Sequence, residues 1–340
     1  MDQTELTELQ NKIAGVSGFV GKLKTEIGKA IVGQDVLVDS LILALLADGH
    51  VLLEGLPGLA KTMVVKSLSQ AISGSFSRIQ FTPDLLPGDV TGTMIYNAAD
   101  HSFAVRKGPI FANIVLADEI NRAPAKVQSA MLECMQEKSV TIGGESHNLA
   151  LPFMVMATQN PIEHEGTYPL PEAQVDRFMF KLEVVYPSRN EEREVIKKMA
   201  HPGLRVSVNA VVSLEEIKNA RKWVDKIYVD EKIYDYILDI VIGTRPEFRN
   251  DLSERQKECD LSRIKDLIQV GASPRASVAL AVAAKAKAFM NGRAYVIPQD
   301  VKSIAADVLR HRIMLTYEAE AESVSPNDII KIILDTLRTP

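Results

Sequence analysis

The sequence has few cysteines, no long apolar run and no excess of basic residues, and each of these absences excludes a class of protein. Cys134 and Cys259 are the only cysteines in 340 residues, and no metal-ligand pattern surrounds them. This excludes a disulfide scaffold and predicts free thiols in a reducing compartment. No apolar run approaches the ~20 residues that a membrane helix needs, and the polar, acidic N-terminus is unlike a signal peptide. We therefore expect a cytoplasmic protein that does not insert into membranes.

Basic residues are too scattered for a typical nucleic-acid-binding protein. The 39 Lys and Arg residues are outnumbered by 44 Asp and Glu residues, which gives a net charge of −5. Nucleic-acid affinity depends on clustered cations that face phosphates, so the charge balance argues weakly against a nucleic-acid partner. Core material is plentiful, because 46% of the residues are hydrophobic, and the length of the chain favours two domains.

The most informative stretch is a glycine-rich segment between an expected strand and an expected helix. Residues 51–54 form an apolar run typical of a buried strand, and the apolar residues within 64–72 fall at helical spacing. Between them, residues 55–62 read GLPGLAKT, which is close to the phosphate-loop pattern G-x-x-x-x-G-K-T. Backbone N–H groups of such a loop, together with the helix N-terminus, form a binding site for anions. The nucleotide-binding residues expected here are Gly55, Leu56, Pro57, Gly58, Leu59, Ala60, Lys61, Thr62 and Met63.

Lys61 and Thr62 have the side chains that phosphate and metal binding require. We expect Lys61 to reach the β- and γ-phosphates of a nucleotide and Thr62 to bind Mg²⁺. Ala60 occupies a position where the pattern has glycine, and its methyl group would stand where the backbone approaches a phosphate oxygen. An ordinary turn between strand and helix is the alternative to nucleotide binding.

Two further apolar runs predict strands that end in polar residues. Residues 114–117 lead into Asp118 and Glu119, and residues 153–157 lead toward Asn160. Ligands of open parallel sheets bind at the carboxyl ends of strands, so these side chains are expected to face the nucleotide. Asp118 would hold Mg²⁺, Glu119 would polarise the attacking water, and Asn160 would hydrogen-bond that water or the γ-phosphate. Solvated turn residues and a turn cap are the structural alternatives.

The regions around this core have simpler patterns. Residues 6–27 carry one apolar stripe interrupted by three glycines, which predicts a helix or helix pair packed on the body rather than a coiled coil. Residues 94–105 and 139–151 each predict a β-hairpin. Beyond residue 185 the pattern is helical, whereas residues 244–263 lack apolar periodicity and predict a solvated linker.

Together these stretches resemble the MoxR family of AAA+ ATPases, over roughly residues 30 to 320. The motifs that carry the resemblance are GLPGLAKT at 55–62, VLADEINRAPAKVQSAMLECMQE at 115–137, ATQNP at 157–161, LPEAQVDRF at 170–178 and GASPRAS at 271–277. Alanine is common in the glycine position of that family's phosphate loop. The resemblance implies an α/β fold, with a three-layer P-loop ATPase core around a parallel sheet and an all-helical lid. The implied domains are an N-terminal helical segment at 1–30, the ATPase core at 31–187, and the C-terminal helical region and lid at 188–340.

The resemblance also implies roles for individual residues. Arg177 resembles the arginine finger that enters a neighbouring subunit's site, and Arg275 resembles sensor 2, which reports nucleotide to the lid. Val32, Gly33 and Gln34 lie where the family's chain passes the adenine. The two hairpins resemble insertions that face the pore of a ring. The remaining counterparts are Lys61 and Thr62 for Walker A, Asp118 and Glu119 for Walker B, and Asn160 for sensor 1.

Elementary electrostatics favours an anionic partner for both arginines. Arg275 follows Ser273 and Pro274, an N-cap residue and a first-turn proline, so its charge lies at the positive end of a helix dipole. A guanidinium supplied from outside the pocket suits the charge spread over the γ-phosphate oxygens and raises rates by roughly 10³ to 10⁵. The structural alternative for Arg177 is a surface ion pair with Asp176, worth ~0–1 kcal/mol.

The expected function is ATP hydrolysis, with ATP and Mg²⁺, by a ring-shaped homo-oligomer that remodels or matures a protein client. A hexamer is the expected ring, and a protein with a von Willebrand factor A domain is an expected partner, as the resemblance implies. Three alternatives stay open: a DNA-directed motor, which Arg106 and Lys107 in one hairpin favour, a metal-chelatase motor subunit, and a nucleotide-gated binding module that hydrolyses little.

Overall fold

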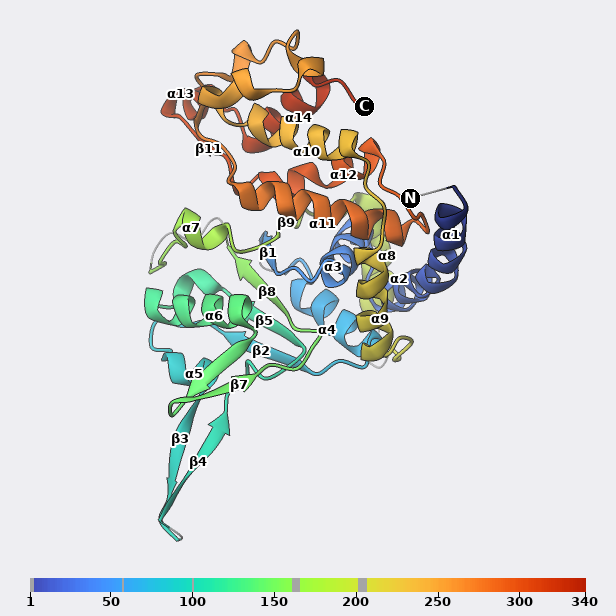
Figure 1. The fold of residues 1–340 in the computed structure, drawn as a ribbon. Helices are drawn as coiled ribbons and strands as arrows, with labels where there is room; N and C mark the ends of the chain where they lie inside the picture. Colours follow the sequence, from blue (N-terminus) through green and yellow to red (C-terminus); the bar gives the residue numbers. More distant parts are fainter. Residues whose placement is uncertain (1–2, 57, 100, 161–165, 201–206) are drawn as a thin grey trace. The chain divides into compact units, whose positions relative to one another are not determined.

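The chain divides into two compact units (Figure 1). The computed structural model describes residues 3–56, 58–99, 101–160, 166–200 and 207–340. Residues 19–178 and 182–219 form one unit, called here the sheet unit, and residues 1–18, 179–181 and 220–340 form the helical unit. Within the described ranges, no helix is both long enough and apolar enough to cross a membrane. The domain boundaries implied by the resemblance, 1–30, 31–187 and 188–340, stay a prediction.

A five-stranded sheet is the centre of the sheet unit, with strand order β2-β5-β8-β1-β9. The pairs β2–β5, β5–β8 and β8–β1 are parallel, so the carboxyl ends of these four strands meet at one edge. The predicted parallel α/β sheet is therefore confirmed. The strands are β1 (Val51–Glu54), β2 (Phe76–Gln80), β5 (Ile114–Asp118), β8 (Met154–Gln159) and β9 (Phe180–Glu183).

Helices cover both faces of this sheet because its central strands are apolar on both sides. In β5, Val115 and Ala117 belong to one core cluster with Val127 and Met131 of α6 (Ala125–Glu137). Successive side chains of a strand point to opposite faces, so the other β5 residues face the side on which α4 (Lys61–Ala71) packs. The remaining helical elements of this unit are α2 (Phe19–Ala30), α3 (Asp35–Leu46), α5 (Pro87–Thr91), η1 (Ile120–Arg122), α7 (Glu172–Val175) and α8 (Arg189–Met199).

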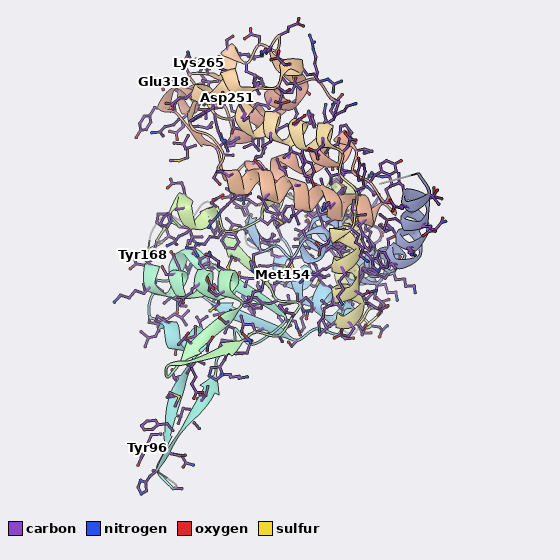
Figure 2. All side chains as sticks on the ribbon, in the orientation of Figure 1. Tyr96, Met154, Tyr168, Asp251, Lys265 and Glu318 are labelled. Atoms are coloured by element: carbon purple, nitrogen blue, oxygen red, sulfur yellow. The ribbon has the colours of Figure 1, made fainter. Side chains whose placement is uncertain are left out.

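Both predicted hairpins are present in the sheet unit. One pairs β3 (Gly92–Asn97) with β4 (Ser102–Lys107), and the other pairs β6 (Ser139–Ile142) with β7 (Glu145–Asn148). The β3–β4 hairpin extends away from the sheet, and Tyr96 lies near its far end (Figures 1 and 2). Both hairpins interrupt the alternation of parallel strands and helices without joining the sheet.

The helical unit contains the N-terminal helix and the C-terminal helices. Of the two predicted possibilities, a helix or a helix pair, the structure has the pair, because α1 (Gln3–Ser17) is separated from α2 at Gly18. Gln10 fixes α1 to this unit: its amide donates to the Gly292 carbonyl at 2.6 Å and accepts from the Ala294 N–H at 2.9 Å. The other elements are α9 (Leu214–Asp225), which straddles the division, α10 (Glu231–Gly243), α11 (Pro274–Met290), α12 (Pro298–Leu309), α13 (Tyr317–Ala321), α14 (Pro326–Thr336), and the strands β10 (Ile268–Val270) and β11 (Met314–Leu315).

The prediction of a solvated linker at residues 244–263 is wrong. This segment folds into the short 3₁₀ helices η2 (Pro246–Asp251), η3 (Glu254–Gln256) and η4 (Ser262–Ile264). Gln256 is 1% exposed and clamps the backbone of Arg338, donating to its carbonyl and accepting from its N–H. The buried residues of this segment are separated by exposed ones, and a 3₁₀ helix is too short to produce a periodic apolar pattern. The sequence pattern therefore does not predict these helices.

Candidate active site

A cavity of about 390 Å³ opens at the carboxyl edge of the sheet, beside the start of α4. Most of the predicted site residues line it together: Gly58, Leu59, Ala60, Lys61, Thr62, Met63, Asp118, Glu119 and Asn160. Three residues that the sequence reasoning did not select complete the lining, namely Arg78, Thr158 and Gln159. The cavity therefore joins the glycine-rich loop to the ends of β2, β5 and β8.

The glycine-rich loop has two residues in the left-handed region. Gly58 and Ala60 both have positive φ, at 85° and 57°, and α4 begins directly after Ala60. Lys61 donates a hydrogen bond to the Gly55 carbonyl at 2.5 Å. Burial lowers the pKa of the Lys61 ammonium, and the nearby carboxylates of Asp118 and Glu119 act in the opposite direction. An anionic ligand in this cavity would find a half-buried cation already in place.

Other predicted nucleotide-binding residues lie outside the lining of this cavity. A side chain at Gly55 would approach the Val184 carbonyl to 2.7 Å, so glycine is required there for packing. Leu56 is also absent from the lining, and Pro57 lies outside the described residues. Val32, Gly33 and Gln34 are in the same unit, and Gly33 and Gln34 contact a different part of the chain. Gln34 donates to the Val185 carbonyl at 3.4 Å, and Gly33 (φ 71°) lies against the Glu191 side chain.

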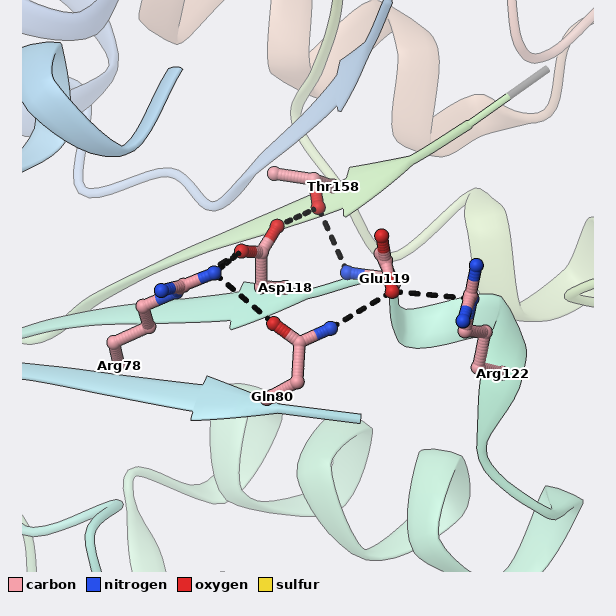
Figure 3. Close-up of polar contacts among 6 residues, drawn as sticks. All are labelled: Arg78, Gln80, Asp118, Glu119, Arg122 and Thr158. Carbon is pink, nitrogen blue, oxygen red and sulfur yellow. Dashed lines mark hydrogen bonds and ion pairs between the residues drawn. The ribbon is translucent and has the colours of Figure 1, made fainter. Parts of the chain in front are cut away.

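Asp118 is held by two neighbouring strands (Figure 3). The Thr158 hydroxyl, from β8, donates to Oδ1 at 2.6 Å. Arg78, from β2, donates to Oδ2 through Nε at 3.0 Å and through Nη2 at 2.6 Å. Both carboxylate oxygens therefore already have donors, and the orientation of the side chain is fixed.

Glu119 is held in a strained backbone conformation. Its φ of 57° lies in the left-handed region, which costs a non-glycine residue on the order of 1–3 kcal/mol. The Glu119 N–H donates to the Thr158 hydroxyl oxygen at 2.8 Å, and the Gln80 amide donates to carboxylate oxygen Oε2 at 2.8 Å. Arg122 makes an ion pair with the same oxygen at 3.1 Å. Figure 3 shows Gln80 and Arg122 meeting at one oxygen of the Glu119 carboxylate.

The sequence contains a signal for the two residues from β2, although it is weak. Arg78 and Gln80 flank Ile79, which is buried in the core cluster, so alternation places both polar side chains on the opposite face. Gln80 is paired in register with Asp118. What the sequence does not reveal is that β2 lies next to β5, because strand order depends on long-range packing.

Arg177 lies in the sheet unit but is not among the residues that line this cavity, and Arg275 lies in the other unit. Arg177 donates to the Gln136 side chain on α6 and lines a second cavity of about 350 Å³ with other residues of that helix. Arg275 belongs to the helical unit, in the first turn of α11, where its N–H donates to the Ser273 hydroxyl at 3.2 Å. The predicted N-cap is therefore confirmed, whereas the roles of both arginines stay predictions.

The donor set of the cavity fits a magnesium ion. Thr62 and Asp118 supply the hard oxygen ligands that Mg²⁺ prefers. No group of three or more His, Cys, Asp or Glu side chains suited to a metal occurs among the described residues. Such an arrangement is typical of Mg²⁺ held by one carboxylate together with substrate phosphates, rather than by a cage of protein side chains.

Comparison with known proteins reveals relatives over almost the whole chain. Residues 50–180 match the family model described as "ATPase family associated with various cellular activities (AAA)", and residues 261–333 match the one described as "AAA lid domain". The chain is 46% identical to Chaperone MoxR1 of Mycobacterium tuberculosis over 332 residues, which cover 96% of this chain and 85% of the relative. It is 46% identical to the uncharacterized protein YeaC of Bacillus subtilis over 325 residues, 95% of each. A crystal structure of a protein from Cytophaga hutchinsonii has 45% sequence identity and a TM-score of 0.89, covering 99% of both chains.

Proposed function

The chain belongs to the MoxR family of AAA+ ATPases and hydrolyses ATP, and we propose that it does so within a hexameric ring to remodel or mature protein clients. The matched AAA lid lies in the helical unit. A relative named as a chaperone supports a protein client for this chain. A partner with a von Willebrand factor A domain is part of the same proposal, as the family resemblance suggests. So is a cytoplasmic location, which the free thiols of Cys134 and Cys259 support.

In the proposed reaction, residues that line the cavity divide the work of phosphoryl transfer. Lys61 binds the β- and γ-phosphates. Glu119 accepts a proton from the attacking water while the oxygen of that water forms a bond to the γ-phosphorus. The bond from that phosphorus to the β–γ bridging oxygen breaks, and ADP leaves. Asn160 hydrogen-bonds the water or the γ-phosphate. When bound, Mg²⁺ neutralises charge on the phosphate oxygens, and Thr62 and Asp118 are the residues that would hold it.

The position of Arg177 is the observation that supports the ring. Within the described residues, this arginine does not line the cavity of its own chain, and its guanidinium is tied to α6 instead. An arginine that stabilises transferred phosphate charge can be supplied by a second chain. In the proposed ring, Arg177 serves the cavity of the neighbouring subunit, and Arg275 acts as sensor 2 from the lid.

Mixing two inactive variants tests this arrangement. Arg177→Ala leaves a subunit with an intact cavity, whereas Lys61→Ala leaves one that still supplies Arg177. Each variant alone is expected to be nearly inactive, because removing an arginine finger lowers turnover by roughly 10³ to 10⁵. After subunit exchange, ATPase activity should reappear at intermediate mixing ratios. A mixture without recovery would overturn the assignment of Arg177 to a neighbouring site.

The exposed face of the β3–β4 hairpin favours a protein client over a nucleic acid. Its aromatic and aliphatic side chains lie in solvent, with Tyr96 50% exposed and Phe103 66% exposed. Extended apolar segments of an unfolded chain bury area against such a surface. Arg106, exposed on β4, is the feature that favours DNA instead.

Two ligands and two variants distinguish these possibilities. Reduced, carboxymethylated α-lactalbumin, which is permanently unfolded, is expected to change the ATPase rate, and single-stranded DNA is not. A double variant, Tyr96→Ser with Phe103→Ser, should keep the basal rate and lose the response to the unfolded protein. Arg106→Gln is the matched control and should respond as the wild type does. Stimulation by DNA that disappears in Arg106→Gln would favour the DNA-directed motor.

A further inference from the structure

Arg78 forms an ion pair with the very carboxylate that is proposed to face Mg²⁺. Its Nε and Nη2 atoms both donate to Asp118 Oδ2, at 3.0 and 2.6 Å (Figure 3). The same Nη2 donates to the Gln80 side chain at 3.1 Å, which fixes the plane of the guanidinium. Arg78 and Asp118 both line the cavity, so the pair borders the space that a bound cation would occupy.

The exposure of the Arg78–Asp118 ion pair indicates that it contributes little to the free energy of folding. The Arg78 side chain is 50% exposed, and that of Asp118 is 14% exposed. Ion pairs at half-exposed positions have small effects on stability, because water screens them and ordering the side chains opposes them. The local charge has a clearer consequence, because the guanidinium attracts the carboxylate and repels any divalent cation that approaches it.

We propose that Arg78 makes Mg²⁺ binding dependent on nucleotide, by neutralising Asp118 until phosphates are present. The inference rests on the proposed function, in which Asp118 faces the metal. In the nucleotide-free site, the guanidinium opposes the approach of a divalent cation to Oδ2. When a nucleotide binds, its phosphates add negative charge beside Lys61, which favours Mg²⁺ and gives the Arg78 guanidinium a second anionic partner. Arg78 is thus a positioning residue, acting on the metal through Asp118.

Thr158 restricts the competition between Arg78 and Mg²⁺ to one oxygen of the Asp118 carboxylate. Its hydroxyl donates to Oδ1 and accepts from the Glu119 N–H, so that side of Asp118 is fixed by the sheet itself. Displacement of Arg78 therefore frees Oδ2 without changing the orientation of the carboxylate. This separates the charge effect of Arg78 from the geometric effect of Thr158.

The test measures metal dependence without turnover. Binding of a fluorescent N-methylanthraniloyl-ADP is titrated with Mg²⁺, and the midpoint Mg²⁺ concentration is compared among variants. Arg78→Gln removes the charge and keeps a hydrogen-bond donor, and it should lower the midpoint by roughly tenfold, the order of magnitude expected for a solvent-screened unit charge beside a divalent cation. Arg78→Lys keeps the charge and should stay near the wild type.

A matched control excludes a general effect of net charge. Arg106→Gln makes the same change of charge at an exposed hairpin position and should leave the midpoint unchanged. Thermal unfolding without nucleotide establishes that each variant is folded. An unchanged midpoint in folded Arg78→Gln would overturn the inference, as would equal shifts in Arg78→Gln and Arg78→Lys.

Asp118→Asn distinguishes failure of this inference from failure of the proposed site. If Asp118→Asn raises the midpoint and Arg78→Gln has no effect, Asp118 faces the metal and only the role of Arg78 is wrong. If Asp118→Asn also has no effect, the proposed metal site itself is wrong.

Discussion

The carboxyl edge of the sheet and the β3–β4 hairpin belong to the same unit, yet they are built in opposite ways. At the edge, side chains join neighbouring strand ends, as Thr158 of β8 bonds both Asp118 and Glu119 at the end of β5. In the hairpin, backbone pairing between two strands provides the order, and large side chains such as Phe103 face solvent.

This difference separates the proposed site of ATP hydrolysis, at the edge of the sheet, from the proposed site of contact with a partner, on the β3–β4 hairpin. Side chains at the ends of β5 and β8 depend on strands whose interior residues are completely buried, so their positions are as fixed as the core. Exposed side chains of the hairpin contact few other residues, so substituting them does not destabilise the core. We therefore expect substitutions at the edge to impair hydrolysis and substitutions in the hairpin to leave it intact.

The largest contrast is expected for one isosteric change made at the edge and, as a control, in the second hairpin. Glu119→Gln should lower turnover by roughly 10² to 10⁴ while ATP affinity is retained, because only the proton acceptor is removed. Glu145→Gln, at an exposed position of the β6–β7 hairpin, is the control and should leave turnover unchanged. Single-turnover kinetics and ATP binding measure the two effects. Loss of binding in Glu119→Gln would mean that the carboxylate is structural.

A second contrast compares two phenylalanines of opposite exposure. Phe153 is 0% exposed just before β8, and its ring packs edge-on against His50 at 5.7 Å. Phe153→Ala should lower the free energy of unfolding by about 3–5 kcal/mol. Phe103→Ala, which loses mainly its ring contact with Tyr96 at 5.2 Å, should lower it by about 1 kcal/mol or less. Urea unfolding measures both, and similar losses would show that the hairpin is part of the core.

A third contrast lies within α4 and tests the loop against the helix that follows it. Lys61→Ala should weaken ATP binding by roughly 10- to 150-fold, the effect of losing a charged hydrogen bond of ~1.5–3 kcal/mol. Lys66→Ala, exposed on the same helix, should leave affinity unchanged. Equal affinities in the two variants would contradict the phosphate-loop assignment.

The sequence predicts the parts of this molecule that repeat a local pattern. The glycine-rich loop, the strands ending at Asp118 and near Asn160, both hairpins and the Ser273 cap follow from periodicity and turn chemistry. Arg78 was missed because its role depends on β2 lying beside β5.

The anchored segment at 244–263 was missed for a related reason. Its contacts, such as Gln256 with the backbone of Arg338, join residues that are 82 positions apart. A local sequence pattern predicts turns and helix caps, but it does not predict which distant residues contact each other.

The smallest expected effect concerns Ala60, whose φ of 57° an L-residue rarely adopts. The left-handed region costs such a residue roughly 1–2 kcal/mol, whereas glycine instead loses about 0.5–1 kcal/mol of additional chain entropy on folding. Ala60→Gly should therefore be as stable as the wild type or more stable by up to about 1 kcal/mol. Ala130→Gly, within α6, is the matched control and should lose about 1 kcal/mol, because a helical backbone favours alanine. Urea midpoints at equal m-values measure both changes. Equal losses at the two positions would mean that the loop backbone at residue 60 is not left-handed in solution, and the strained entry to α4 would then be absent.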